Sequence, residues 1–123
     1  MKNILVVEDE PAYATLLRDQ LVNKGYHVVE AANGKEGLKQ AKKERPDIIL
    51  LDIRMPVMDG MTMLDALRKE EGDKKAKVII LTNLEPDHKI VGQAVDSQPS
   101  HYFVKSDVVL NDLLKKIEEL LEE

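Results

Sequence analysis

Several short apolar runs in this chain end directly at a polar residue, and this feature constrains the fold more than any other. The runs are rich in Val, Ile and Leu and do not alternate with polar residues. Such runs are typical of strands that are buried on both faces of a parallel sheet. They cover residues 4–7, 48–51, 78–81 and 102–104, and they are followed by Glu8-Asp9, Asp52, Thr82 and Lys105. Because parallel strands bring their carboxyl ends to one edge of a sheet, we expect these polar groups to lie together.

Stretches with helical spacing separate the apolar runs. Their apolar stripes consist of Tyr13, Leu16, Leu17 and Leu21, then Met63, Leu64 and Leu67, then Ile90, Val91, Ala94 and Val95, and finally Leu110, Leu113, Leu114, Ile117, Leu120 and Leu121. A further strand is expected at residues 27–31, at an edge of the sheet because no acid follows it. Five alternations of strand and helix predict an α/β fold: a doubly wound, five-stranded parallel sheet of flavodoxin-like (βα)5 type, in strand order 2-1-3-4-5.

Local signals mark where several of these elements begin and end. Pro11 and Pro86 suit the first turn of a helix, where an N–H group has no helical partner. Asn33 followed by Glu36 predicts a helix start with reciprocal capping, and Gly25 suits the residue after a helix end. Ser106 is a candidate N-cap for the last helix. Met55, Met58, Met61 and Met63 are interpreted as adaptable packing residues.

The composition sets limits on the protein as a whole. A chain of 123 residues suits one domain, expected to span 1–123. It contains no cysteine and no apolar run long enough to cross a bilayer, and no signal peptide precedes the first run, so we expect a cytoplasmic protein without membrane association. The formal net charge is −5 and no cluster of Lys or Arg stands out, which argues against direct nucleic-acid binding.

The polar groups at the expected sheet edge have the chemistry of a phosphoryl-transfer site. Glu8, Asp9 and Asp52 would repel one another unless a cation neutralised them, and Mg²⁺ prefers such oxygen ligands. Asp52 is the candidate nucleophile, since an aspartate can hold a phosphoryl group as an acyl phosphate. Lys105 would supply a positive charge to the phosphoryl oxygens and Thr82 a hydroxyl donor. Each residue alone has an ordinary interpretation as a loop acid, strand residue or surface charge, and only their convergence favours a site.

The segment from Asp52 to Gly60 reads Asp-x-x-Met-Pro-x-Met-Asp-Gly, and with Glu8-Asp9 it makes the whole chain resemble the receiver domains of two-component response regulators. The resemblance implies that Asp52 accepts a phosphoryl group from a histidine kinase or a histidine phosphotransfer protein, without the chain being a turnover enzyme. It implies that Asp9 binds Mg²⁺ directly, with Glu8 acting through water and the backbone carbonyl of Arg54 as a further ligand.

The same resemblance implies a switch. Thr82 would move toward the phosphoryl group and Tyr102 would turn inward behind it. The surface of the fourth helix, fifth strand and fifth helix would then change for a downstream effector protein, with the unphosphorylated chain a monomer.

The chain departs from the family pattern at several positions. Ser106 replaces the usual proline after the lysine, and Asn83 follows Thr82 where a small residue is usual. Residues 96–101 replace a run that helps to form a common dimer face, which argues against that dimer. We hypothesise that Arg54 slows hydrolysis of the acyl phosphate by crowding the attacking water. An Arg54→Ala variant that loses its phosphoryl group no faster would contradict this hypothesis.

Three other interpretations compete with a stand-alone receiver. The chain could be a receiver cut from a DNA-binding transcription regulator, which the length of the native gene product would decide. A Mg²⁺-dependent phosphohydrolase of the haloacid dehalogenase type would need a second aspartate where Arg54 stands. A flavin-binding module would need a phosphate-binding loop where Glu8-Asp9-Glu10-Pro11 carries acids.

Overall fold

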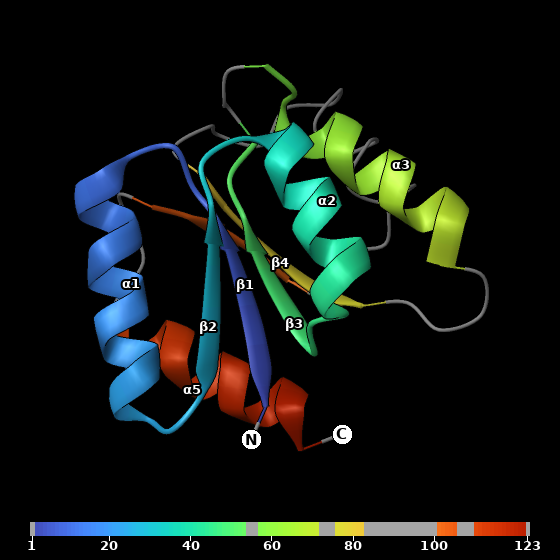
Figure 1. The fold of residues 1–123 in the computed structure, drawn as a ribbon. Helices are drawn as coiled ribbons and strands as arrows, with labels where there is room; N and C mark the ends of the chain where they lie inside the picture. Colours follow the sequence, from blue (N-terminus) through green and yellow to red (C-terminus); the bar gives the residue numbers. More distant parts are fainter. Residues whose placement is uncertain (1, 54–56, 72–75, 83–100, 106–109, 123) are drawn as a thin grey trace.

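The structure, a computed structural model, describes residues 2–53, 57–71, 76–82, 101–105 and 110–122 (Figure 1). Within these residues it contains five strands and four helices, with the labels of Figure 1. In chain order they are β1 (Asn3–Val7), α1 (Pro11–Asn23), β2 (His27–Ala31), α2 (Gly34–Glu44), β3 (Ile48–Leu51), α3 (Gly60–Glu71), β4 (Lys77–Thr82), β5 (His101–Val104) and α5 (Leu110–Leu121). The stripe predicted at residues 90–95, Pro86 and Ser106 lie outside the described residues. No described helix is long and apolar enough to cross a membrane.

The five strands form one parallel sheet in the order β2-β1-β3-β4-β5, so the predicted fold class and strand order are confirmed. β2 lies at one edge, as expected for a strand without a site residue. The register pairs Val7 with Leu51 and Thr82 with Val104. Glu8 and Asp52, which follow Val7 and Leu51, therefore lie close together, and Lys105, which follows Val104, lies beside the end of β4.

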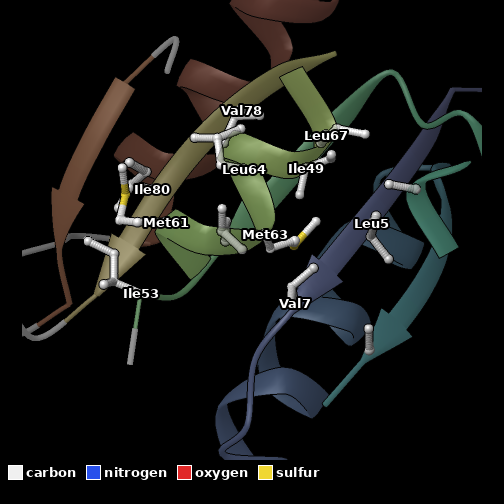
Figure 2. Packing of buried hydrophobic residues seen from close by; sticks show 13 residues of the cluster. Leu5, Val7, Ile49, Ile53, Met61, Met63, Leu64, Leu67, Val78 and Ile80 are labelled. Atoms are coloured by element: carbon white, nitrogen blue, oxygen red, sulfur yellow. The ribbon is translucent and has the colours of Figure 1, made fainter. Parts of the chain in front are cut away.

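Helices cover both faces of the sheet and create two apolar cores (Figure 1). Alternate residues of each central strand belong to opposite cores, which explains why the strands are apolar throughout. One core joins β1, β3 and β4 to α2 and α3, and Figure 2 shows Met63 and Leu64 of α3 lying over the side chains of this sheet face. The other core joins the opposite face to α1 and α5.

The methionines near α3 fill this first core, as predicted. Met61 and Met63 are buried and Met58 packs against the same cluster. Met55 lies outside the described residues. The stripe predicted for α1 is wrong at Leu16, which is 44% exposed, while Ala14 is buried. Successive helical residues are rotated by about 100°, so Leu16 lies beyond the edge of the stripe that faces the sheet.

The predicted start and stop signals of α1 and α2 are confirmed. α1 begins at Pro11, and Gly25 follows its end with a φ of 93°. Asn33 accepts a hydrogen bond from the Glu36 N–H at 2.8 Å. The return bond differs from the expected one: the Glu36 carboxylate accepts from the N–H of Ala32, one residue before the cap, at 3.2 Å.

Two glycines allow the loop after β3 to lie close to its neighbours. The Gly34 N–H donates to the Met58 carbonyl at 2.9 Å, and the Gly60 N–H donates to the Ile53 carbonyl at 2.8 Å. A Cβ atom on Gly60 would stand 2.1 Å from the Asp52 carbonyl oxygen, and one on Gly34 would stand 2.2 Å from that of Met58. Only glycine therefore fits at these two positions.

Candidate functional site

The carboxyl edge of the sheet brings together most of the predicted site residues. Glu8, Asp52 and Thr82 are buried there. The Asp52 N–H donates to the Val7 carbonyl at 3.0 Å, which ties the start of the loop after β3 to β1. The Lys105 N–H donates to the Thr82 carbonyl at 2.7 Å, which fixes the end of β5 beside β4. The strand register thus positions an acid, a hydroxyl and an ammonium at one place, as the sequence predicts.

The ammonium of Lys105 is the centre of the site. Its Nζ lies 2.6 Å from Glu8 Oε2, 3.2 Å from Glu10 Oε1 and 3.3 Å from Asp52 Oδ2. It also lies 4.7 Å from the centre of the Tyr13 ring, a cation–π distance. The Lys105 side chain is only 5% exposed. We call Lys105 with the side chains of Glu8, Glu10, Asp52 and Tyr13 the Lys105 cluster.

Burial and charge shift the pKa values of this cluster. Burial raises the pKa of Glu8 to about 7, and the nearby charge of Asp52 acts in the same direction against the lowering effect of Lys105. Burial alone would lower the pKa of Lys105, but its hydrogen bond to Glu8 and the charges of Asp52 and Glu8 outweigh it and raise that pKa. Lys105 therefore stays protonated, while the carboxylates around it lie close enough to repel one another.

The same acids offer ligands for a hard cation. Carboxylate oxygens of Glu8, Glu10 and Asp52 lie within 4.8 Å of one another. Oxygen ligands of this kind suit Mg²⁺, so the donors fit the metal that the sequence predicts. Asp9, the predicted direct ligand, is exposed and is not one of these three converging acids. Arg54, the predicted carbonyl ligand, lies outside the described residues.

Glu10 was not among the predicted site residues, yet its carboxylate contacts Lys105 and converges with those of Glu8 and Asp52. From the sequence it was considered only as an acid that argues against flavin binding. One available signal was Pro11, because a residue before proline is restricted to extended backbone angles. Glu10 adopts such angles, with φ −88° and ψ 107°, and its side chain turns back to Lys105.

Tyr102, the predicted switch aromatic, lies on β5 opposite Ile80 of β4. Its side chain is half-buried and packs against the core formed with α2 and α3. Asn83 and residues 96–100 lie outside the described residues. Of residues 96–101, which differ from the family pattern, only His101 is described, at the start of β5.

Comparisons with known proteins agree on one family. The sequence profile described as "Response regulator receiver domain" matches residues 4–118. A curated relative, the alkaline phosphatase synthesis transcriptional regulatory protein PhoP of Bacillus subtilis, is 44% identical over 70 residues, which cover 57% of this chain and 29% of the relative. The chain spans about half the length or less of three curated relatives that it matches.

Solved structures match over the whole fold. A CheY-like response regulator receiver domain protein from Methanospirillum hungatei has a TM-score of 0.90 and 30% identity, covering 99% of this chain and 94% of that one. The response regulator TrrA from Thermotoga maritima, solved in complex with Mg²⁺-BeF, has a TM-score of 0.84 and 35% identity, covering 98% of this chain and 99% of that one.

Proposed function

This chain belongs to the family of response regulator receiver domains, and from that membership we propose that Asp52 is its phosphoacceptor. One observation carries the proposal: Asp52 is buried at the carboxyl edge of the sheet with its Oδ2 3.3 Å from the ammonium of Lys105. A nucleophilic carboxylate beside a fixed positive charge is suited to attack a phosphoryl group and to stabilise its oxygens.

The proposed reaction uses side chains that the fold already holds in place. An Asp52 oxygen attacks phosphorus, a new P–O bond forms, and the bond from phosphorus to the donor breaks. The electron pair of that bond leaves with the donor's leaving group, which takes up a proton. The Lys105 ammonium and the Thr82 hydroxyl bind phosphoryl oxygens and so stabilise the charge that develops on them. The protein promotes its own phosphorylation and dephosphorylation and is not a turnover enzyme.

The metal proposed for this reaction is Mg²⁺, held by Asp52, Glu8 and Asp9 with the backbone carbonyl of Arg54. The convergence of carboxylates at this edge supports the metal, although its members include Glu10 and not Asp9. When bound, Mg²⁺ neutralises the carboxylates and part of the phosphoryl charge. Lys105 is the protein's own positive charge and interacts with the phosphoryl oxygens.

We propose a class of protein for the phosphoryl donor and another for the downstream effector. The donor is a histidine kinase or a histidine phosphotransfer protein. Phosphorylation shifts the population of two states through Thr82 and Tyr102, and a downstream effector reads the surface of β5, α5 and the helix predicted around residues 90–95. The chain spans only part of its curated relatives, several of which are named as transcriptional regulators, so a DNA-binding output domain is a second possible effector.

The deciding experiment is intact mass spectrometry after incubation with Mg²⁺ and acetyl phosphate. Wild type should gain a single labile phosphoryl group, and Asp52→Asn should gain none. An Asp59→Asn variant is a matched control, because Asp59 is exposed and its carboxylate instead accepts the Thr62 N–H at 2.8 Å. If wild type binds Mg²⁺ and gains no adduct, or if Asp52→Asn gains one, the proposal is wrong.

A further inference from the structure

The side chain of Glu10 contacts Lys105, and no step of the proposed reaction uses that contact. Glu10 is the N-cap residue of α1, a position whose side chain usually accepts a hydrogen bond from the first helical turn. Here the side chain makes no capping hydrogen bond. Its Oε1 lies 3.2 Å from the Nζ of Lys105, 95 residues away in the sequence. The carboxylate therefore contacts Lys105 in the site and does not cap the helix.

The backbone of Glu10 is fixed by its neighbours on both sides. Pro11 restricts it to the extended region, which matches its φ of −88° and ψ of 107°. Its N–H donates to Glu8 Oε1 at 3.1 Å, while the other oxygen of that carboxylate binds Lys105. Glu8, Lys105 and Glu10 thus form a closed ring of contacts, so only the Glu10 side-chain torsions remain to be ordered when the contact with Lys105 forms.

Lys105 has as many carboxylate partners as it has hydrogen-bond donors. An ammonium group carries three N–H donors, and Nζ lies within 3.3 Å of three carboxylates, those of Glu8, Glu10 and Asp52. A phosphoryl oxygen can bind Lys105 only if one of these carboxylates gives up its place. Glu10 is the most exposed of the three, at 57% against 3% and 6%. Water can solvate its carboxylate, so its release from Lys105 costs least.

We propose that Glu10 is a positioning residue that holds Lys105 in the unphosphorylated protein and releases it when a phosphoryl group arrives. This inference rests on the function proposed for Asp52 and adds an element of regulation to it. Glu10 competes with the phosphoryl group for the same ammonium and also repels an anionic donor. It therefore lowers both the rate of phosphorylation and the affinity for a phosphoryl mimic.

The test compares Glu10→Gln with wild type and with Glu119→Gln. Glutamine keeps the length of the side chain and removes its charge. Glu119 is a matched control, because it is 50% exposed and lies 3.1 Å from Lys116 on α5, so its substitution breaks a similar ion pair away from the site. All three proteins are incubated with saturating Mg²⁺, and two quantities are measured: the initial rate of phosphorylation by acetyl phosphate and the Kd for beryllofluoride.

We expect Glu10→Gln to react roughly two- to five-fold faster and to bind beryllofluoride tighter by a similar factor, the range that an exposed ion pair supports. Glu119→Gln should match wild type. Since salt screens an exposed pair, the difference between Glu10→Gln and wild type should shrink as ionic strength rises. The ¹⁵N resonance of Lys105 Nζ in the unphosphorylated protein should shift in Glu10→Gln alone.

Two outcomes would overturn the inference in different ways. Equal rates and affinities for wild type and Glu10→Gln, or weaker beryllofluoride binding by Glu10→Gln, would refute the role of Glu10 while the adduct on Asp52 still formed. Absence of any adduct on wild type would refute the phosphoacceptor proposal itself and this inference with it. Circular dichroism and thermal melts of each variant establish that the compared proteins are equally folded.

Discussion

At the scale of single residues, Val57 has an unusual backbone conformation. It has a φ of 71° in the loop between β3 and α3, and its side chain is 77% exposed. The left-handed region costs a residue with a Cβ atom about 1–2 kcal/mol, and a β-branched residue is a clear outlier there. Because so little of its side chain is buried, packing in the folded chain repays little of this cost.

Replacing Val57 with asparagine should therefore stabilise the protein. Asparagine tolerates the left-handed region, so we expect the free energy of unfolding to rise by about 1 kcal/mol in urea titrations. Val22→Asn is the control, since Val22 is an exposed valine of helix α1, and its effect should stay within about 0.5 kcal/mol. No gain from Val57→Asn would mean that the strain at this position is smaller than its φ implies.

A second residue-scale prediction concerns pH. Burial raises the pKa of Glu8 from 4.5 to about 7, so the folded protein keeps this proton at pH values where the unfolded chain has lost it. Without divalent cations, the free energy of unfolding should fall as pH rises through this window, and Glu8→Gln should flatten the fall. Urea titrations in EDTA between pH 5 and pH 8 measure how the free energy of unfolding changes with pH in wild type and in Glu8→Gln.

A wild-type free energy of unfolding that rises with pH in this window would contradict the prediction. Excess Mg²⁺ should oppose the fall, because metal binding requires the carboxylate form.

At the scale of elements, Gly60 sets how closely α3 approaches the end of β3. Alanine at this position would place its Cβ 2.1 Å from the Asp52 carbonyl oxygen, so the helix start or the loop would have to shift. We expect Gly60→Ala to lower the free energy of unfolding by about 2 kcal/mol or more, within the range of overpacked sites. It should also slow phosphorylation, because the backbone of the nucleophile moves.

Gly25→Ala provides the comparison for this prediction. Gly25 has a φ of 93°, but nothing lies within 4 Å of an added Cβ. Its substitution should cost only the backbone strain, about 1 kcal/mol, and should leave the phosphorylation rate unchanged. Chemical denaturation of both variants ranks the two costs. If Gly25→Ala lowers the free energy of unfolding more than Gly60→Ala, the loop after β3 can shift at little cost to accommodate the added methyl group.

The elements themselves could largely be predicted from the sequence, and the details of the site could not. Continuous apolar runs identify strands buried on both faces, and a parallel register then brings Asp52, Thr82 and Lys105 to one edge. The orientation of a side chain after a strand depends on a few backbone angles that no periodicity reports. For this reason the sequence did not single out Glu10, which contacts Lys105. The metal-binding role of Asp9 came from the family resemblance and stays a prediction.

At the scale of the whole molecule, the site links segments that are distant in the chain. Lys105 follows β5, Asp52 follows β3, and Glu8 and Glu10 lie between β1 and α1. The binding site that these groups form exists only when the sheet is formed. A ligand bound there must therefore stabilise the entire fold and not a single loop.

Mg²⁺ and beryllofluoride together should therefore raise the free energy of unfolding of wild type. At concentrations 100-fold above the Kd the gain should be about 2.7 kcal/mol. Asp52→Asn should lose the part of this gain that depends on beryllofluoride, since the proposed acceptor oxygen is gone. Thermal melts with Mg²⁺ alone and with both ligands separate the two parts. If beryllofluoride stabilises wild type and Asp52→Asn equally, it does not bind at Asp52.

The position of β1 has a consequence for how the chain acquires its structure. β1 pairs with β2 on one side and with β3 on the other, and the Asn3 N–H is bound by the Asp47 carboxylate, 44 residues further along. During synthesis β1 therefore emerges before either of its neighbours, and β3 is still unmade when β2 is available to pair with it. Its apolar side chains stay in contact with water or chaperones until the segment around residue 51 has emerged. Nascent chains that end before the third strand should be degraded or aggregate, because β1 cannot complete its pairing in them.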